Sequence, residues 1–320
     1  MTKRSFDIPV LNEKLIAALQ LLDGGMNGSR DYVINRLRQP AMEKFLQTGL
    51  PSPKHEEWRF TPIEASLKKI SKISLQPAPL SAEVEKVISS LEPVDSYKLV
   101  LVNGKPADPV VVTMEGVEFM SLSEAQKKIP EVIEQHYGKY LSTDREAFNA
   151  INTALSSDGV ILYVRKNVAV DKPFHLVHVH DNREEGNLIL GRVLVVLEEG
   201  ASASISETHI SLSPHFSFAN LGAEIKVAAN ARVEYQLVQH LSLLNRSESS
   251  VVDNRIISLE KDGFCNFTTV TLSGQLVRNN LTVRFDAVNG ECHLYGLYMP
   301  SSHELFDNHT VVDHAVRNCF

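Results

Sequence analysis

Hydrophobic and polar positions alternate with a period of two along much of the second half of the chain. In residues 201–208 alanine and isoleucine alternate with serine. A similar alternation of apolar and polar residues occurs in residues 233–237 and 264–272. Successive side chains of a β-strand point to opposite faces, so this pattern gives each segment one apolar face. The stretch from Arg192 to Pro300 is therefore predicted to fold as repeated strand–turn–strand units.

The predicted turns recur at Gly200, Asn230, Gly263 and Gly290, which lie 30, 33 and 27 residues apart. Glycine and asparagine tolerate the positive φ that tight turns need. A repeat of this size predicts a β-solenoid, in which each rung buries its apolar face against its neighbours. The alternative is a large antiparallel sandwich or barrel, which also uses short strands and regular turns. The recurring spacing favours the solenoid.

The first half of the chain has a different periodicity. Apolar residues at helical spacing in residues 11–22 and 32–45 predict two helices, and shorter helices are expected further along. We expect three parts: a helical N-terminal region over residues 1–95, a mixed α/β connecting region over 96–158, and a β-helix core over 159–320. The boundary at Gly159 is where helical periodicity gives way to strand periodicity.

A proline-rich segment, residues 49–63, interrupts the helical region. Three prolines within residues 51–62 forbid a regular helix there, yet the segment contains the single tryptophan, Trp58, with Phe60 beside it. Aromatic side chains in such a loop usually fix it to a neighbouring surface. We expect Trp58 and Phe60 to anchor this loop.

Composition narrows the class of protein. With 43% hydrophobic and 22% charged residues among 320, the chain resembles a soluble globular protein, and a formal charge of −7 argues against a nucleic-acid partner. No run of eighteen apolar residues and no signal-peptide pattern occurs, so we expect a cytoplasmic protein without membrane contact. Cys265, Cys292 and Cys319 are widely spaced and odd in number, which fits reduced thiols.

One constellation suggests a metal-dependent enzyme. His178 and His180 lie two apart on a predicted strand, so their side chains share a face, and Glu184 follows nearby. The group resembles part of the first motif of the cupin family. However, Lys172 stands where that motif has glycine, no second cupin motif follows Gly191, and the surroundings of Glu184 are typical of a solvated turn. A chance match is the better explanation.

A second set of candidate ligands lies in the tail. His309, His314 and Cys319 offer imidazole and thiolate ligands suited to iron or zinc, alone or together with ligands from a partner. No Cys-x-x-Cys, phosphate loop or nucleophile elbow occurs, so the chain is not expected to hold a four-thiolate cluster, bind a nucleotide or act as a hydrolase. Ordinary surface histidines are the alternative interpretation of the tail.

Several segments together resemble the SufB/SufD family of iron–sulfur cluster assembly proteins. They follow the family order along most of the chain, and the Lys-His-Glu-Glu-Trp run favours the SufD branch. The segments are residues 49–62, 148–155, 171–175, 192–200 and 307–316, with Cys319.

The resemblance implies a helical N-terminal region followed by a right-handed parallel β-helix that serves as a non-catalytic scaffold. Family members pair with a SufB-like paralogue and bind a SufC-like ATPase. An iron–sulfur cluster is implied only transiently at the interface of the complex, with no cofactor held stably by this chain alone. The cupin-like enzyme using His178, His180 and Glu184 remains the alternative function, and a homodimer is the alternative to pairing with the paralogue.

The family pattern continues beyond Phe320, through further β-helix and a C-terminal region that docks the ATPase. We therefore expect an incomplete β-helix here, with that docking region and a family cluster-site histidine lying outside this sequence. Arg317 stands where the family usually has proline. His309, His314 and Cys319 are the residues expected nearest the partner interface.

Overall fold

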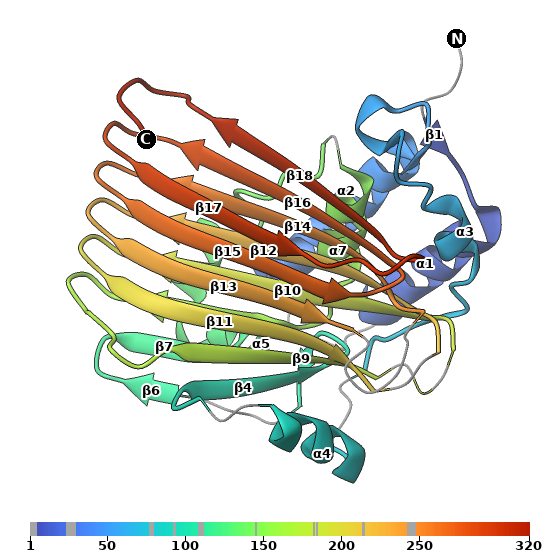
Figure 1. The fold of residues 1–320 in the computed structure, drawn as a ribbon, viewed down its shortest axis with the longest axis horizontal. Helices are drawn as coiled ribbons and strands as arrows, with labels where there is room; N and C mark the ends of the chain where they lie inside the picture. Colours follow the sequence, from blue (N-terminus) through green and yellow to red (C-terminus); the bar gives the residue numbers. More distant parts are fainter. Residues whose placement is uncertain are drawn as a thin grey trace.

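The computed structural model describes residues 5–23, 30–76, 80–91, 94–107, 112–144, 146–181, 183, 185–212, 215–241 and 248–320. Its N-terminal part is mainly helical and its C-terminal part is a regular stack of strands (Figure 1). The elements up to the start of the stack are β1 (Ser5–Phe6), α1 (Pro9–Leu21), α2 (Val33–Thr48), β2 (Leu50–Pro51), the 3-10 helix η2 (Glu56–Trp58), α3 (Glu64–Lys68), β3 (Lys72–Ile73), α4 (Ala82–Ser90), β4 (Tyr97–Val102), β5 (Lys105–Pro106), β6 (Val112–Met114), β7 (Val117–Ser121), α5 (Leu122–Lys128), α6 (Pro130–His136) and α7 (Ala147–Leu155).

The remaining strands wind back and forth between two sheets. They are β8 (Val160–Val164), β9 (Phe174–His180), β10 (Asn187–Leu197), β11 (Ser202–Ser211), β12 (Ser217–Val227), β13 (Arg232–His240), β14 (Ser250–Leu259), β15 (Phe264–Ser273), β16 (Leu276–Phe285), β17 (Glu291–Tyr298) and β18 (Leu305–Asp313). Even-numbered strands from β8 to β18 form one sheet, and odd-numbered strands from β9 to β17, together with β4, form the other.

Each strand of the stack pairs in parallel with the strand two elements further along, as β10 does with β12 and β11 with β13. This arrangement confirms the predicted helical region followed by a parallel β-helix. It also excludes the antiparallel sandwich or barrel, whose neighbouring strands run in opposite directions. Antiparallel pairing occurs at the beginning of the stack, where β6, β7 and β8 are neighbours.

The predicted turns form one corner of the solenoid. Gly200, Asn230, Asp262 and Asn289 all have positive φ, between 55° and 70°. The amide of each residue donates to a carbonyl of the next rung, for example from Asn230 to Lys261 at 2.9 Å. The corners therefore stack as a hydrogen-bonded column, and they connect strands of different sheets rather than the two strands of a hairpin.

The interior between the sheets contains a polar band between two apolar clusters. Near the corner column the inward-facing residues are apolar, and they form a cluster that includes Val195, Ile225 and Tyr235. Further along the same strands inward-facing positions carry buried polar side chains, among them Glu207 and Arg255, and a second apolar cluster lies beyond them. Buried polar groups are costly unless paired, so this band depends on hydrogen bonds between its side chains.

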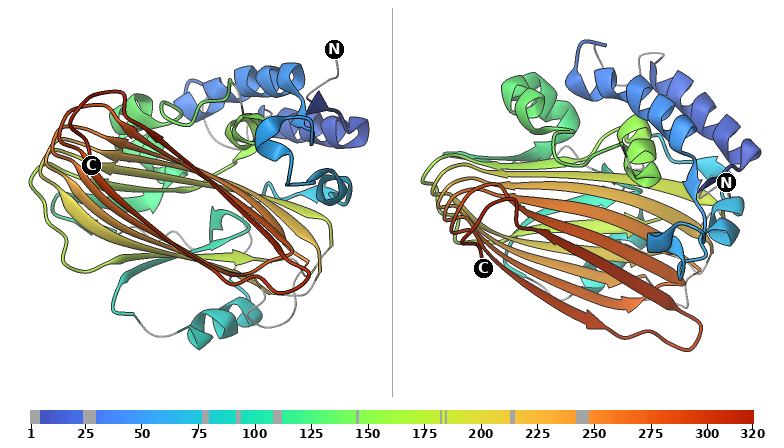
Figure 2. Two further views of the ribbon diagram at one scale, coloured as in Figure 1. Left: turned by 45° about the horizontal axis from the view of Figure 1, so that its top comes forward. Right: turned by 90° about the horizontal axis from the view of Figure 1, so that it is seen from above.

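Helices cover the outer face of the even-numbered sheet. Figure 2 shows α1, α2 and α7 gathered on that side of the solenoid, with α4 on the opposite side. The proline-rich segment of residues 49–63, here called the aromatic loop, packs against these helices through Trp58. The Trp58 side chain is 1% exposed. The centroid of its ring lies 5.2 Å from that of Phe148 and 4.1 Å from the central carbon of the Arg278 guanidinium. The prediction of an anchor is confirmed for Trp58 and wrong for Phe60, whose side chain is 78% exposed.

Two of the last strands present apolar side chains to solvent. The exposed large apolar residues here are Tyr295, Leu297, Tyr298, Met299, Val311 and Val312. No helix in the described parts of the chain is both long and apolar enough to cross a membrane.

Candidate metal centre inside the solenoid

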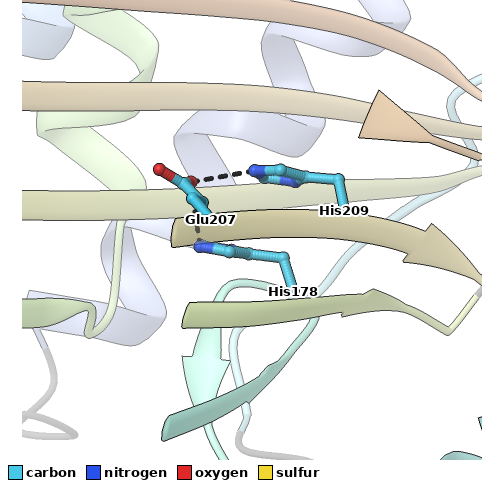
Figure 3. Close-up of side chains that lie close together, drawn as sticks. All are labelled: His178, Glu207 and His209. Carbon is cyan, nitrogen blue, oxygen red and sulfur yellow. Dashed lines mark hydrogen bonds and ion pairs between the residues drawn. The ribbon is translucent and has the colours of Figure 1, made fainter. Parts of the chain in front are cut away.

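Three potential metal ligands meet on the inner face of the odd-numbered sheet. His178 of β9 and His209 of β11 occupy directly paired positions on neighbouring parallel strands. Glu207 precedes His209 by two residues, so the pleat turns both side chains to the same face. The three side chains lie close together (Figure 3). Each of them is at most 3% exposed.

The three side chains converge on one carboxylate oxygen. Oε1 of Glu207 lies 3.0 Å from Nε2 of His178 and 2.8 Å from Nε2 of His209. The two imidazole rings stack with centroids 4.2 Å apart and planes 13° from parallel. Among the described residues, this is the only group of three such side chains whose ligand atoms lie within 4.8 Å of one another.

A third imidazole supports the cluster. Nε2 of His180 lies 3.1 Å from Nδ1 of His209, and the two rings meet edge to face. Burial, followed by the neighbouring His178, lowers the pKa of His209 to about 4, and burial likewise lowers the pKa of His180 well below its usual value. Both rings are therefore neutral at physiological pH, the state in which imidazole binds a metal.

Glu207 is held in the opposite charge state. Burial opposes its ionisation, but the Arg255 guanidinium and His178 lower the pKa of the Glu207 carboxyl well below its usual value. Arg255 donates to Oε2 at 2.6 Å and to Oε1 at 3.0 Å, and the Tyr235 hydroxyl donates to Oε2. Arg255 also donates to Asp253 at 2.9 Å. The carboxylate is thus fixed in position and negatively charged.

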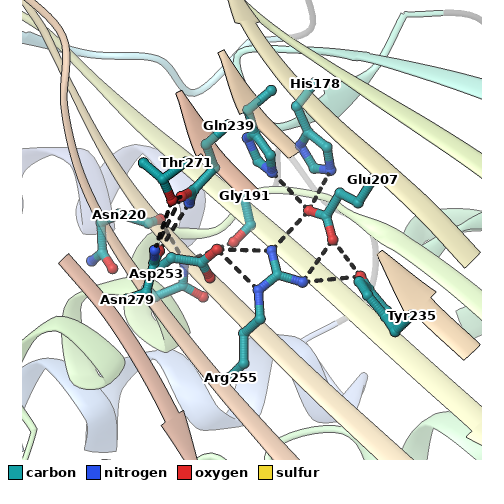
Figure 4. A network of polar contacts seen from close by, with 12 residues as sticks. His178, Gly191, Glu207, Asn220, Tyr235, Gln239, Asp253, Arg255, Thr271 and Asn279 are labelled. Carbon is teal, nitrogen blue, oxygen red and sulfur yellow. Dashed lines mark hydrogen bonds and ion pairs between the residues drawn. The ribbon is translucent and has the colours of Figure 1, made fainter. Parts of the chain in front are cut away.

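A second hydrogen-bonded group lies further along the interior (Figure 4). Gln239 donates to Asn279 at 2.9 Å and accepts from Thr271 at 2.8 Å, and Asn279 donates in turn to Asn308 of β18 at 3.0 Å. Each of these side chains faces the interior. The inward-facing positions of the same strands nearer the corner column carry apolar side chains. The buried polar side chains of the interior thus form two hydrogen-bonded groups, one around Glu207 and one around Asn279.

The sequence identified part of this centre. It placed His178 and His180 on one strand with a shared face, and the structure confirms that placement. The proposed third member, Glu184, lies outside the described residues. The cupin-like alternative does not fit the fold, because cupins are antiparallel jelly rolls and the strands around His178 pair in parallel.

Sequence reasoning missed Glu207 and His209. The sequence did contain one indication of them. Glu207 and His209 continue the alternating positions of Ala203 and Ile205, which face the interior. A carboxylate and an imidazole therefore occupy positions where the alternation predicts apolar side chains. Their proximity to His178 could not be deduced, because it depends on how β9 and β11 are aligned.

The tail residues occupy separate positions. His309 lies in β18 opposite Asn280, His314 stacks on Phe285 with centroids 5.0 Å apart, and the Cys319 thiol lies 3.5 Å from the carbonyl of Ala287. The structure describes residues 248–320 throughout, and it does not gather these three into a group of ligands within 4.8 Å. A role with ligands from a partner stays a prediction.

The cysteines are free thiols. Cys265 and Cys292 are paired in register on β15 and β17, and Cys265 is fully buried in the apolar interior. The adjacent Cys292 thiol and burial raise the pKa of Cys265 well above its usual value. Cys265 is thus an unreactive protonated thiol, as expected for a small apolar group in a strand.

Comparison with known proteins extends over nearly the whole chain. Residues 21–176 match the family described as SufBD protein N-terminal region, and residues 178–320 match the family described as SUF system FeS cluster assembly, SufBD core domain. The iron–sulfur cluster assembly protein SufD of Escherichia coli is 26% identical over 286 residues, which cover 88% of this chain and 63% of that protein. The SufD of Bacillus subtilis is 26% identical over 222 residues, 65% of this chain and 49% of that protein. The chain thus spans about half to two thirds of the length of these relatives.

Proposed function

Because this chain belongs to the SufBD family of SUF-system proteins, we propose that it acts as a scaffold subunit in iron–sulfur cluster assembly. The observation that carries this proposal is the match to both family regions in succession along one chain. The scaffold pairs with a SufB-like paralogue in the cytoplasm and works with a SufC-like ATPase. The cluster is the cargo of that complex and is not a resident cofactor of this chain.

A non-enzymatic role is consistent with the chemistry of the site. The ionisable cluster around Glu207 is buried between the two sheets, so a substrate of ordinary size has no direct contact with it. The relatives are named as assembly proteins. We therefore place the function in assembly with other subunits.

The exposed apolar side chains of the last rungs are the proposed pairing region. Tyr295 and Leu297 are 57% and 51% exposed on β17, and Val311 and Val312 of β18 lie in the neighbouring sheet. Exposed apolar residues are often found at protein–protein contact sites. Pairing through this region would bring His309, His314 and Cys319 close to the partner.

Co-expression tests the proposal. The tagged chain should retain a SufB-like paralogue through purification and, through that paralogue, a SufC-like ATPase. The double change Tyr295→Lys and Leu297→Lys should abolish this capture, because it places two charges in an apolar contact. The control is Val10→Lys, a change of a valine on α1 that is 62% exposed, which should leave capture intact.

Absence of either protein from the purified complex would overturn the scaffold proposal. Size-exclusion chromatography of the chain alone, and of the chain with the paralogue, distinguishes a homodimer from pairing with the paralogue. A dimer that resists dissociation by the paralogue would favour that alternative.

A further inference from the structure

We propose that His178, Glu207 and His209 bind one divalent first-row transition-metal ion inside the solenoid. The site goes beyond the scaffold role, which requires no resident metal, and it is separate from the tail residues His309, His314 and Cys319. Two imidazoles and one carboxylate form a ligand set found in zinc and non-haem iron sites.

The spacing of the ligand atoms fits such an ion. A metal with ligands at about 2.1 Å has adjacent ligand atoms roughly 3.0 Å apart in an octahedron and roughly 3.4 Å apart in a tetrahedron. The two contacts of Glu207 Oε1 measure 3.0 Å to His178 and 2.8 Å to His209. They match two edges of an octahedron. The third edge forms when the stacked rings tilt so that their Nε2 atoms approach each other.

The cluster also contains hydrogen-bonding capacity that the protein leaves unused. Neither ring nitrogen of His178 makes a hydrogen bond of acceptable geometry, although Nε2 lies at ion-pair distance from Glu207. Buried polar atoms are nearly always satisfied, so an exception of this kind points to a missing ion or water. A metal between His178 Nε2, His209 Nε2 and Glu207 Oε1 would supply the partner.

The surrounding residues already have the arrangement of an outer coordination shell. Ligating histidines commonly engage their second nitrogen in a hydrogen bond, and His209 does so with His180. Tyr235 and Arg255 hold the Oε2 atom of Glu207, and Arg255 also donates to Oε1 at 3.0 Å, so the carboxylate is fixed with Oε1 next to the two imidazoles (Figure 4). Asp253 neutralises the nearby Arg255, so the cluster does not carry an excess positive charge that would repel a cation.

Metal analysis of the full chain tests the site. The protein is dialysed against chelator and then supplied with Fe²⁺ under anaerobic conditions, Zn²⁺ or Mn²⁺ in separate arms. Because the ligands are buried, each arm is run on the native protein and on protein refolded with the metal. We expect one ion per chain in at least one arm, and the arms distinguish which metal the site prefers.

Variants locate the ion. His209→Gln should weaken binding by more than about 10-fold, since it removes a ligand and not merely an outer-shell contact. The matched control is His175→Gln, which changes another buried histidine of β9 whose ring contacts Thr208 and none of the three proposed ligands. Equal binding by wild type and His209→Gln would overturn the proposal.

A crystallographic measurement covers the case in which His209→Gln does not fold. Anomalous scattering from wild-type crystals grown with the preferred metal should give a peak between His178, Glu207 and His209. A peak at any other position, or the absence of bound metal from both native and refolded wild type, would refute the site.

Discussion

Replacing Glu224 by alanine should destabilise the fold by about 5 kcal/mol. This residue of β12 has no exposed surface, and its carboxylate accepts from Arg192 at 2.5 Å. It also accepts from three backbone amides of the segment after α6, those of Gly138 and Tyr140 at 2.8 Å and Leu141 at 3.1 Å. The carboxylate therefore joins the even-numbered sheet to the segment between α6 and α7.

The expected loss of stability follows from the groups that the substitution leaves buried without a partner. Removing one partner of a buried ion pair costs about 3–5 kcal/mol, because the remaining charge stays buried. Each backbone amide left without an acceptor adds about 1 kcal/mol where water cannot reach it. Gly138 and Tyr140 are only half-buried and can regain water, so we add one such term, for Leu141.

The control is an ion pair of the same length on the surface. Arg36 and Glu134 also lie 2.5 Å apart, but their side chains are 51% and 57% exposed. Glu134→Ala should therefore cost no more than about 1 kcal/mol. The contrast between the two variants tests burial rather than distance.

Equilibrium unfolding in guanidinium chloride measures both effects, followed by circular dichroism and by the fluorescence of the single tryptophan. The double variant Arg192→Met with Glu224→Met should lose at least about 2 kcal/mol less than the sum of the losses for Arg192→Met and Glu224→Met alone, since neither charge then stays buried without its partner. If Glu224→Ala costs no more than Glu134→Ala, the assignment of this pair as a stabilising joint is wrong.

Three further predictions concern single positions. Trp58→Ala should cost about 3–5 kcal/mol in chemical unfolding because the ring is fully packed, whereas Phe60→Ala should change stability by less than about 0.5 kcal/mol. Burial lowers the pKa of Lys105 to about 8, so the unfolded chain binds more protons between pH 8 and 10.5 and stability should rise by about 2 kcal/mol from pH 7 to 9.5. Lys105→Met should remove this rise, and an unchanged pH profile would contradict the assignment. Gly104→Ala should lower the thermal midpoint measurably, because the added Cβ would lie 2.2 Å from the carbonyl oxygen of Leu190 at a residue with φ of +82°.

The regular part of the fold was predictable because its determinants are local. Alternation within residues 201–208 specifies a strand with one inward face, whatever lies beside it. Asn230 and Gly200 are residues that accept positive φ, and both adopt it at the corners. The repeat between such corners was enough to indicate a solenoid.

The aromatic loop marks the limit of local reasoning. Trp58 and Phe60 have similar surroundings in the sequence, but only Trp58 has the Arg278 guanidinium and the Phe148 ring against it. Both partners come from elements far away in the chain. Burial of one ring and exposure of the other is therefore a property of packing.

The same distinction applies to the candidate metal centre. The chain order alone indicates that His178 and His180 share a face, since that follows from the pleat of one strand. The meeting of His178 with Glu207 and His209 depends on the register between β9 and β11, where His209 lies opposite His178. A shift of one residue in that register would turn the side chains to opposite faces of the sheet. Tertiary structure therefore decided the site, because the alignment of two strands a full rung apart is set by the loops and core packing between them.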